Sequence, residues 1–218
     1  MLKRVASIIK DSSFELNGEK YDLTPNAGKD QLHGGPDAFD KKLWNVDDVE
    51  GGLAFSLASP DGENGFPGNV DIKVTFTLDD ANALSIKYQG STDKDTPLSL
   101  TNHSYFNLNG FQETIHQHKV QIAATKALET DEDFAPIGKL TEVSGTPGDF
   151  RKAKFLSKAF AQSETGILQY YVFDNDSESL KQVASFEDQV TGRRLSVWTT
   201  EPGMLLYTGF FTSDKLRR

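Results

Sequence analysis

The stretch DIKVTFTL, Asp71–Leu78, alternates polar and apolar residues with a period of two. A half-buried β-strand shows this period because successive side chains point to opposite faces of the sheet. The residues that follow, Asp79–Asn82, are typical of a turn, and the alternation resumes in ALSIKY, Ala83–Tyr88. The two runs and the turn between them predict an antiparallel β-hairpin.

Similar strand patterns recur along the chain. Phe14–Leu16 and Glu19–Tyr21 flank Asn17-Gly18, a residue pair that favours a two-residue hairpin turn. Further strand-like runs lie at residues 119–122, 169–173, 182–186 and 194–199, and one short helix is predicted at 154–162. Many strands separated by turns predict an all-β, antiparallel sandwich. Because no linker or internal repeat interrupts them, residues 1–218 are expected to form a single domain.

The composition limits the classes of partner. The chain has 218 residues, of which 37% are hydrophobic and 11% aromatic, enough for a folded core. A net charge of -9 argues against nucleic-acid binding, because neutralising phosphates needs a basic face. The absence of cysteine excludes disulfides and thiolate metal sites, and a reducing cytoplasm is the default expectation. An organelle lumen after removal of a transit peptide stays open. No apolar run is long enough for membrane insertion.

Two of the four histidines stand out from their neighbours. His33 lies in the segment LHGGP, where glycines allow a ligand to approach the backbone closely. His103 lies in LTNHSYFNL, and strand alternation would place Thr101, His103 and Tyr105 on one face. Imidazole, hydroxyl and aromatic groups together suit a sugar, although a structural histidine explains the pattern equally well. The other two histidines, His116 and His118, are expected at the surface.

A series of motifs runs through the chain in a recognisable order. They are Asn26, LHGG at Leu32–Gly35, FDKKLW at Phe39–Trp44, SPDGENGFPG at Ser59–Gly68, LTNHSYFNL at Leu100–Leu108, TTEPG at Thr199–Gly203 and YTG at Tyr207–Gly209. In these motifs, over nearly its whole length, the sequence resembles the aldose 1-epimerase (galactose mutarotase) family. The resemblance implies a β-supersandwich that interconverts the α and β anomers of galactose or glucose without a metal or cofactor.

The resemblance also implies roles for particular residues. In the family a glutamate removes the proton of the anomeric hydroxyl while a histidine protonates the ring oxygen, so that the sugar ring opens and closes on the other face. His103 matches that general acid. His33, Asn102 and Tyr105 match positions in the segments that bind substrate. No metal ligand is expected.

The pattern breaks at several positions that the family uses for binding. A substrate-contacting arginine is replaced by Ile8, an aspartate by Leu168, a glutamine by Leu205 and an asparagine by Phe210, while Ser7 stands for another asparagine and Arg4 matches a first, retained arginine. Leucine, isoleucine and phenylalanine side chains cannot replace the lost hydrogen bonds to sugar hydroxyls. No residue of the chain matches the glutamate base, and Glu201 corresponds to a non-catalytic position.

These departures favour one of three functions. The supersandwich is expected to be incomplete at both its N- and C-terminal ends, with partner subunits covering the exposed sheet edges. The favoured interpretation is therefore a catalytically impaired relative that acts as a scaffold or interaction subunit in a complex. The two alternatives are an active aldose 1-epimerase with His103 as general acid, and a carbohydrate-binding module that uses the His33 and His103 face.

Overall fold

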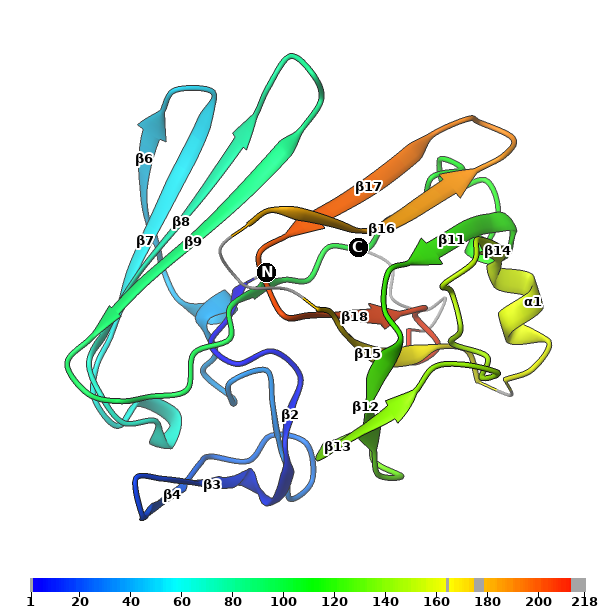
Figure 1. The fold of residues 1–218 in the computed structure, drawn as a ribbon. Coiled ribbons are helices and arrows are strands. Elements are labelled where there is room, and N and C mark those ends of the chain that lie inside the picture. The colour runs from blue at the N-terminus through cyan, green and yellow to red at the C-terminus, as the bar shows by residue number, and fades with distance from the viewer. Residues whose placement is uncertain (1, 164, 175–178, 213–218) are drawn as a thin grey trace. The chain divides into compact units, whose positions relative to one another are not determined.

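A computed structural model of the chain describes residues 2–163, 165–174 and 179–212 (Figure 1). The chain divides into two compact units, Met1–Ser104 and Tyr105–Arg218, each with a hydrophobic core of its own. Every pair of named strands in the described residues is antiparallel, as the alternation predicts. The single domain expected from the sequence stays a prediction. Among the described residues no helix is long and apolar enough to cross a membrane.

A four-stranded sheet dominates the first unit (Figure 1). Its strands, in the order of their pairing, are β6 (Asn45–Val49), β7 (Gly52–Ser59), β8 (Val70–Leu78) and β9 (Leu84–Thr92). The predicted hairpin is confirmed as β8 and β9. Val70, Ile72 and Val74 are buried on one face of β8 and form the core with Phe39, whereas Asp71 and Lys73 are exposed on the other face.

Three two-stranded ribbons complete the first unit. They pair β1 (Leu2–Lys3) with β10 (Thr101–Asn102), β2 (Ile8–Ile9) with β5 (Gln31–Leu32) and β3 (Ser13–Leu16) with β4 (Glu19–Asp22). Short 3-10 helices lie at Lys10–Ser12, Phe39–Lys41 and Glu63–Gly65. The turn between β3 and β4 has positive φ at both Asn17 (55°) and Gly18 (79°), which matches the twist of a hairpin and confirms the predicted turn.

The second unit contains two four-stranded sheets. One has the order β14 (Lys154–Phe155), β11 (His118–Ile122), β16 (Lys181–Asp188), β17 (Arg194–Thr199), and the other β13 (Pro136–Glu142), β12 (Lys126–Thr130), β15 (Leu168–Val172), β18 (Gly203–Tyr207). Both sheets contribute to one core, through Val120, Val183 and Ala184 from the first and Ala127 and Tyr171 from the second. The unit is thus a sandwich.

Helical structure is scarce in the second unit. A 3-10 helix lies at Ile115–Gln117 and the helix α1 spans Leu156–Phe160. This α1 is shorter than the predicted 154–162, because Lys154 and Phe155 pair with β11 as strand β14.

Two sequence expectations are wrong. LTNHSYFNL is a strand only at Thr101–Asn102, so alternation does not place Thr101, His103 and Tyr105 on one face. The Ser104 N–H donates to Asn102 Oδ1 at 2.9 Å, a local bond that competes with strand pairing. His118 is buried rather than exposed, because it begins β11 and lies opposite Asp188 of β16.

Candidate functional site

His33 and His103 meet in the first unit although they are far apart in the sequence. Their ring centroids are 5.2 Å apart and the ring planes are inclined by 85°, so one imidazole meets the other edge to face. The candidate general acid and a candidate substrate-binding histidine therefore lie within reach of one small ligand. Among the described residues no group of acidic and histidine side chains could hold a metal ion.

The N-terminal segment explains why the two histidines meet. On one side the His33 N–H donates to the Ser7 carbonyl oxygen at 2.8 Å. On the other side the Ser99 N–H donates to the Arg4 carbonyl oxygen at 2.8 Å, and the Ala6 N–H donates to the Ser99 carbonyl at 3.0 Å. Residues 4–7 thus lie between the segment that carries His33 and the segment that leads to His103.

Glycines allow the His33 loop to approach the N-terminal segment. Gly34 has φ of +88°, and a Cβ atom there would lie 3.2 Å from the Arg4 Cβ atom. Gly35 has φ of +98°, and a Cβ atom there would lie 3.0 Å from Gln31 Nε2. Residues that carry a Cβ atom rarely adopt these backbone angles. The glycines of LHGGP thus allow neighbouring chain segments to approach closely, and the close approach of a ligand stays a prediction.

Arg4 anchors the same segment in the interior of the first unit. It is only 2% exposed, and its guanidinium donates to Ser59 Oγ at 2.9 Å, to the Pro67 carbonyl at 3.2 Å and to Thr96 Oγ1 at 2.9 Å. The guanidinium also lies over the Phe66 ring, 4.6 Å from its centroid. Burial lowers the pKa of Arg4 to about 10, and the nearby Glu63 partly opposes this shift. Arg4 thus remains a cation at neutral pH, and its contacts give it a structural role in the first unit.

Glu63 extends the network of Arg4. It accepts a hydrogen bond from Ser59 Oγ at 2.8 Å and forms an ion pair with Lys42 Nζ at 2.7 Å. Lys42 and Glu63 come from the FDKKLW and SPDGENG motifs, so this ion pair joins the two motifs.

The remaining predicted site residues, Asn102 and Tyr105, lie on either side of His103 in the sequence. Asn102 Oδ1 already accepts the Ser104 N–H. Tyr105 belongs to the second unit, where it is 51% exposed and its ring centroid lies 6.1 Å from that of Tyr207. Partial burial raises the pKa of Tyr105, and Tyr207 adds to this shift. Whether Asn102 and Tyr105 touch a ligand stays a prediction.

The apolar replacements have defined surroundings. Ile8 lies in β2 opposite Leu32, next to the His33 loop. In the second unit Leu168 is opposite Tyr207, and Leu205 is opposite Tyr170, on β15 and β18. Opposite residues of an antiparallel pair point to the same side, so these four side chains share one face. The other face carries Tyr171, Met204 and Leu206, which pack on the core.

An aromatic cluster continues that face of the second unit and was not predicted from the sequence. The Phe210 ring lies 5.2 Å from Tyr207, 5.9 Å from Phe134 and 4.5 Å from Phe211. Tyr207, Phe210 and Phe211 belong to the end of β18 and the residues after it, whereas Phe134 lies between β12 and β13, so the chain fold brings these two segments together. Where the family has an asparagine, Phe210 thus contributes an apolar surface rather than a hydrogen bond.

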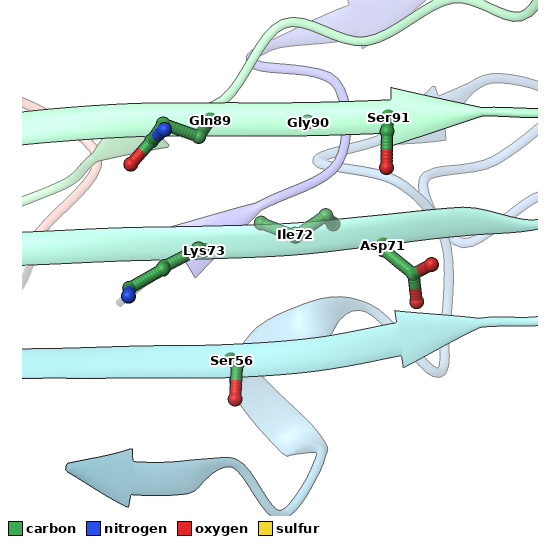
Figure 2. A pocket seen from close by; sticks show the side chains of 7 residues that line it. All are labelled: Ser56, Asp71, Ile72, Lys73, Gln89, Gly90 and Ser91. Atoms are coloured by element: carbon green, nitrogen blue, oxygen red, sulfur yellow. The ribbon is translucent and has the colours of Figure 1, made fainter.

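Two surface depressions lie apart from the predicted site residues. One, of about 370 Å³, crosses β7, β8 and β9 and is lined by Ser56, Asp71, Ile72, Lys73, Gln89, Gly90 and Ser91 (Figure 2). The other, of about 410 Å³, lies in the second unit between His116, Phe160 and Phe210. The first is the solvated polar face of a sheet, so depth alone does not identify the site.

Comparison with known proteins gives a consistent result. The family description aldose 1-epimerase matches residues 1–217. Galactose mutarotase of Sus scrofa is 39% identical over 215 residues, which are 98% of this chain and 63% of that protein. Aldose 1-epimerase of Escherichia coli (strain K12) is 37% identical over 214 residues, which are 95% of this chain and 62% of that protein. The chain thus spans less than two thirds of the length of these relatives.

Solved structures agree. A GalM/aldose epimerase homologue from C. elegans superposes with a TM-score of 0.89 at 32% identity, over 97% of this chain and 65% of the other. Galactose 1-epimerase from Lactobacillus acidophilus superposes with a TM-score of 0.83 at 26% identity, over 96% of this chain and 63% of the other. These similarities confirm the predicted all-β, galactose mutarotase-like fold. The chain belongs to the aldose 1-epimerase family.

Proposed function

We propose that this protein binds an aldose sugar at the His33–His103 pair and interconverts its anomers. The observation that carries the proposal is the edge-to-face contact of the two imidazoles, 5.2 Å apart, in the motifs that the family retains. Relatives named galactose mutarotase and aldose 1-epimerase support this chemistry. In the proposed reaction His103 is the general acid that protonates the ring oxygen, solvent water accepts the proton of the anomeric hydroxyl, and His33 binds a sugar oxygen.

The proposed activity is weaker than that of the curated relatives. Ile8, Leu168, Leu205 and Phe210 stand where the family has polar side chains, and each unmade hydrogen bond costs roughly 1–3 kcal/mol. Because about 1.4 kcal/mol corresponds to a factor of ten, two such losses reduce the affinity for galactose by roughly 30-fold or more. The proposal is therefore an impaired aldose 1-epimerase with a retained histidine pair.

Mutarotation of freshly dissolved α-D-galactose and α-D-glucose, followed by polarimetry, tests this activity. The rate in the presence of the protein should exceed the rate in buffer, and His103→Gln should remove the excess. His116→Gln is the matched control because His116 is an exposed histidine outside the pair, and it should keep the rate. A wild-type rate equal to that of buffer would contradict the catalytic proposal.

Sugar binding without catalysis corresponds to the carbohydrate-binding alternative. Saturation-transfer NMR with galactose, glucose and a disaccharide separates the two, because it detects millimolar binding even when no anomer is interconverted. Binding that disappears in both His33→Asn and His103→Gln, with no rate above buffer, would favour a binding module. Absence of binding and of rate would favour a protein that no longer uses the pair for sugar.

A second candidate function, an interaction subunit, has support from the sheet of the first unit. Val46, Leu53, Leu78 and Leu84 are 52%, 40%, 60% and 57% exposed. The strand register places them on the same face as the buried Val74. Exposed apolar patches of this kind favour association.

Association is measured by light scattering coupled to size exclusion, on the wild type and on Leu78→Glu/Leu84→Glu. A complex or oligomer that the double variant dissociates would support the interaction subunit, and a monodisperse wild-type monomer at every concentration would contradict self-association. The cytoplasmic location stays a prediction.

A further inference from the structure

An imidazole nitrogen replaces a carbonyl oxygen at the end of the β2–β5 ribbon. The ribbon pairs Ile9 with Gln31 and Ile8 with Leu32, so the next pair in register is Ser7 with His33. At that pair the His33 N–H donates to the Ser7 carbonyl at 2.8 Å, as in a regular ladder. The Ser7 N–H instead donates to His33 Nδ1 at 3.0 Å.

Backbone conformation explains the substitution. Ser7 has φ of 65° and His33 has φ of 58°, and both angles lie outside the strand region. The positive angles end the ladder and turn the His33 side chain back to its partner strand. As a result the two residues are joined by one main-chain bond and one bond from main chain to imidazole.

The acceptor role of Nδ1 restricts the protonation of the ring. A nitrogen that accepts a hydrogen bond carries no proton, and a neutral imidazole that accepts at Nδ1 carries its proton at Nε2. A proton on Nδ1 would face the Ser7 N–H. Ser7 is only 9% exposed, so its N–H would then lose an acceptor that water does not readily replace.

We infer that the Ser7 main-chain N–H fixes His33 as a neutral imidazole with its proton on Nε2. Ser7 is therefore a positioning residue, acting through its backbone rather than its side chain. This makes His33 a hydrogen-bond donor at Nε2, suited to an oxygen of the ligand, and unsuited to take up a proton at Nδ1.

A neutral His33 gives the two histidines different roles in the reaction, an assignment that rests on the proposed function. Two cationic imidazoles 5.2 Å apart would repel each other, so a pair that needs one acid works best when the other ring stays neutral. With His33 held neutral, His103 is the ring that carries the proton to be delivered to the sugar oxygen. His33 then binds its sugar oxygen without competing for that proton.

Nitrogen-15 NMR of histidine-labelled protein tests the inference directly. Two-bond correlations from the ring protons identify the protonated and unprotonated nitrogen of each imidazole, and loss of one spin system in His33→Asn assigns His33. At neutral pH we expect Nδ1 of His33 to have the shift of an unprotonated acceptor and Nε2 that of a protonated nitrogen. A protonated Nδ1, or averaged shifts of two exchanging tautomers, would overturn the inference.

Backbone substitution isolates the contribution of Ser7. An amide-to-ester replacement at residue 7 removes its N–H alone, and the two ring nitrogens of His33 should then move toward averaged shifts. Ser7→Gly keeps the N–H and accepts a positive φ, so it should retain the wild-type tautomer. An ester variant with wild-type shifts would show that another contact sets the tautomer. If the ester variant does not fold, the wild-type spectrum alone still decides.

The variant His33→Asn tests the loss of the Nε2–H donor while the conformation of the loop is kept. Asparagine tolerates positive φ, and its side-chain oxygen can accept the Ser7 N–H, but it lacks the donor at the Nε2 position. The variant should fold and lose at least tenfold in sugar affinity or rate.

The tautomer and the mutarotation rate are independent readouts. The expected tautomer without mutarotation contradicts the proposed function alone, and mutarotation with a protonated Nδ1 contradicts this inference alone.

Discussion

The two units of the chain are stabilised in different ways. Among the described residues the core of the first unit has four buried members, and the core of the second unit has thirteen. The first unit instead buries polar groups, namely Arg4, Ser7, Ser12, Asp30, Gln31 and Ser59, whereas the second buries His118 and Asp188. Apolar packing is non-directional, and hydrogen bonds fix direction. The unit that contains the histidine pair therefore depends more on directional contacts.

Truncating the core of the second unit gives the largest expected effect. Phe150 is fully buried, and its carbonyl accepts the Ile122 N–H at 2.9 Å. We expect Phe150→Ala to lower the free energy of unfolding by about 3–5 kcal/mol, because it removes apolar contact and leaves a cavity. Urea unfolding gives the magnitude, and hydrogen exchange by mass spectrometry should show the loss of protection in peptides after residue 105.

The control is Phe106→Ala in the same unit. Phe106 is 57% exposed, so its truncation should change the free energy of unfolding by no more than about 0.5 kcal/mol. Equal effects of Phe150→Ala and Phe106→Ala would break the comparison, because the second unit would then not depend on its core.

Removing the buried cation tests the first unit in the same way. Arg4→Met keeps an unbranched chain beside Phe66 but leaves Ser59 Oγ, the Pro67 carbonyl and Thr96 Oγ1 without their guanidinium donor. We expect a loss of roughly 3 kcal/mol, with lower hydrogen-exchange protection in peptides before residue 104.

Arg194→Met is the matched control for Arg4→Met. Arg194 is an exposed arginine of β17, and its replacement should be neutral within about 0.5 kcal/mol. If Arg4→Met were as neutral as Arg194→Met, the polar network would not stabilise the first unit. The NMR shifts of His33 should also change in Arg4→Met, because the Gly34 backbone packs on Arg4.

The same contrast explains what could be predicted from the sequence. Strand β8 and the Asn17-Gly18 turn were predictable, because alternation and turn chemistry are local properties. Strand β7 was not predicted, because the residues on the same face as Lys73 are small ones, Ser56 and the buried Ala54, rather than charged ones. The retained motifs predicted His33 and His103 as candidate site residues. No local sequence pattern shows that the Ser7 N–H donates to the His33 ring.

Two glycines of one loop in the first unit differ in the space around them. Gly62 and Gly65 both have positive φ, of +82° and +90°. A Cβ atom on Gly62 meets nothing within 4 Å, whereas one on Gly65 would lie 2.4 Å from the Asp22 carbonyl oxygen. We expect Gly62→Ala to cost about 1 kcal/mol for its backbone angle alone, and Gly65→Ala roughly 2 kcal/mol or more because backbone must also move.

Thermal unfolding of the two variants measures the difference in their stability. Both variants replace one glycine with alanine, so they have the same composition. Equal costs would mean that the SPDGENG loop moves away from β4 without loss, and the loop would then not belong to the rigid surroundings of Arg4.

His118 is one of the two buried polar residues named above for the second unit, and it gives the smallest expected effect. It is 4% exposed, and its Nε2 accepts the Leu108 N–H at 3.1 Å. Burial lowers the pKa of His118, and the facing Asp188 only partly opposes this shift. An unfolded histidine has a pKa of about 6.5, so below that pH the unfolded chain binds a proton that the folded chain resists. Stability is therefore full above about pH 6.5 and decreases as the pH falls through that value.

We expect the free energy of unfolding to fall between pH 7.5 and 5.5 because of this group, and urea unfolding at each pH measures the fall. In His118→Gln the amide oxygen can still accept the Leu108 N–H, but the group no longer titrates, so this part of the pH dependence should disappear. If His118→Gln kept the full dependence, other groups would cause it.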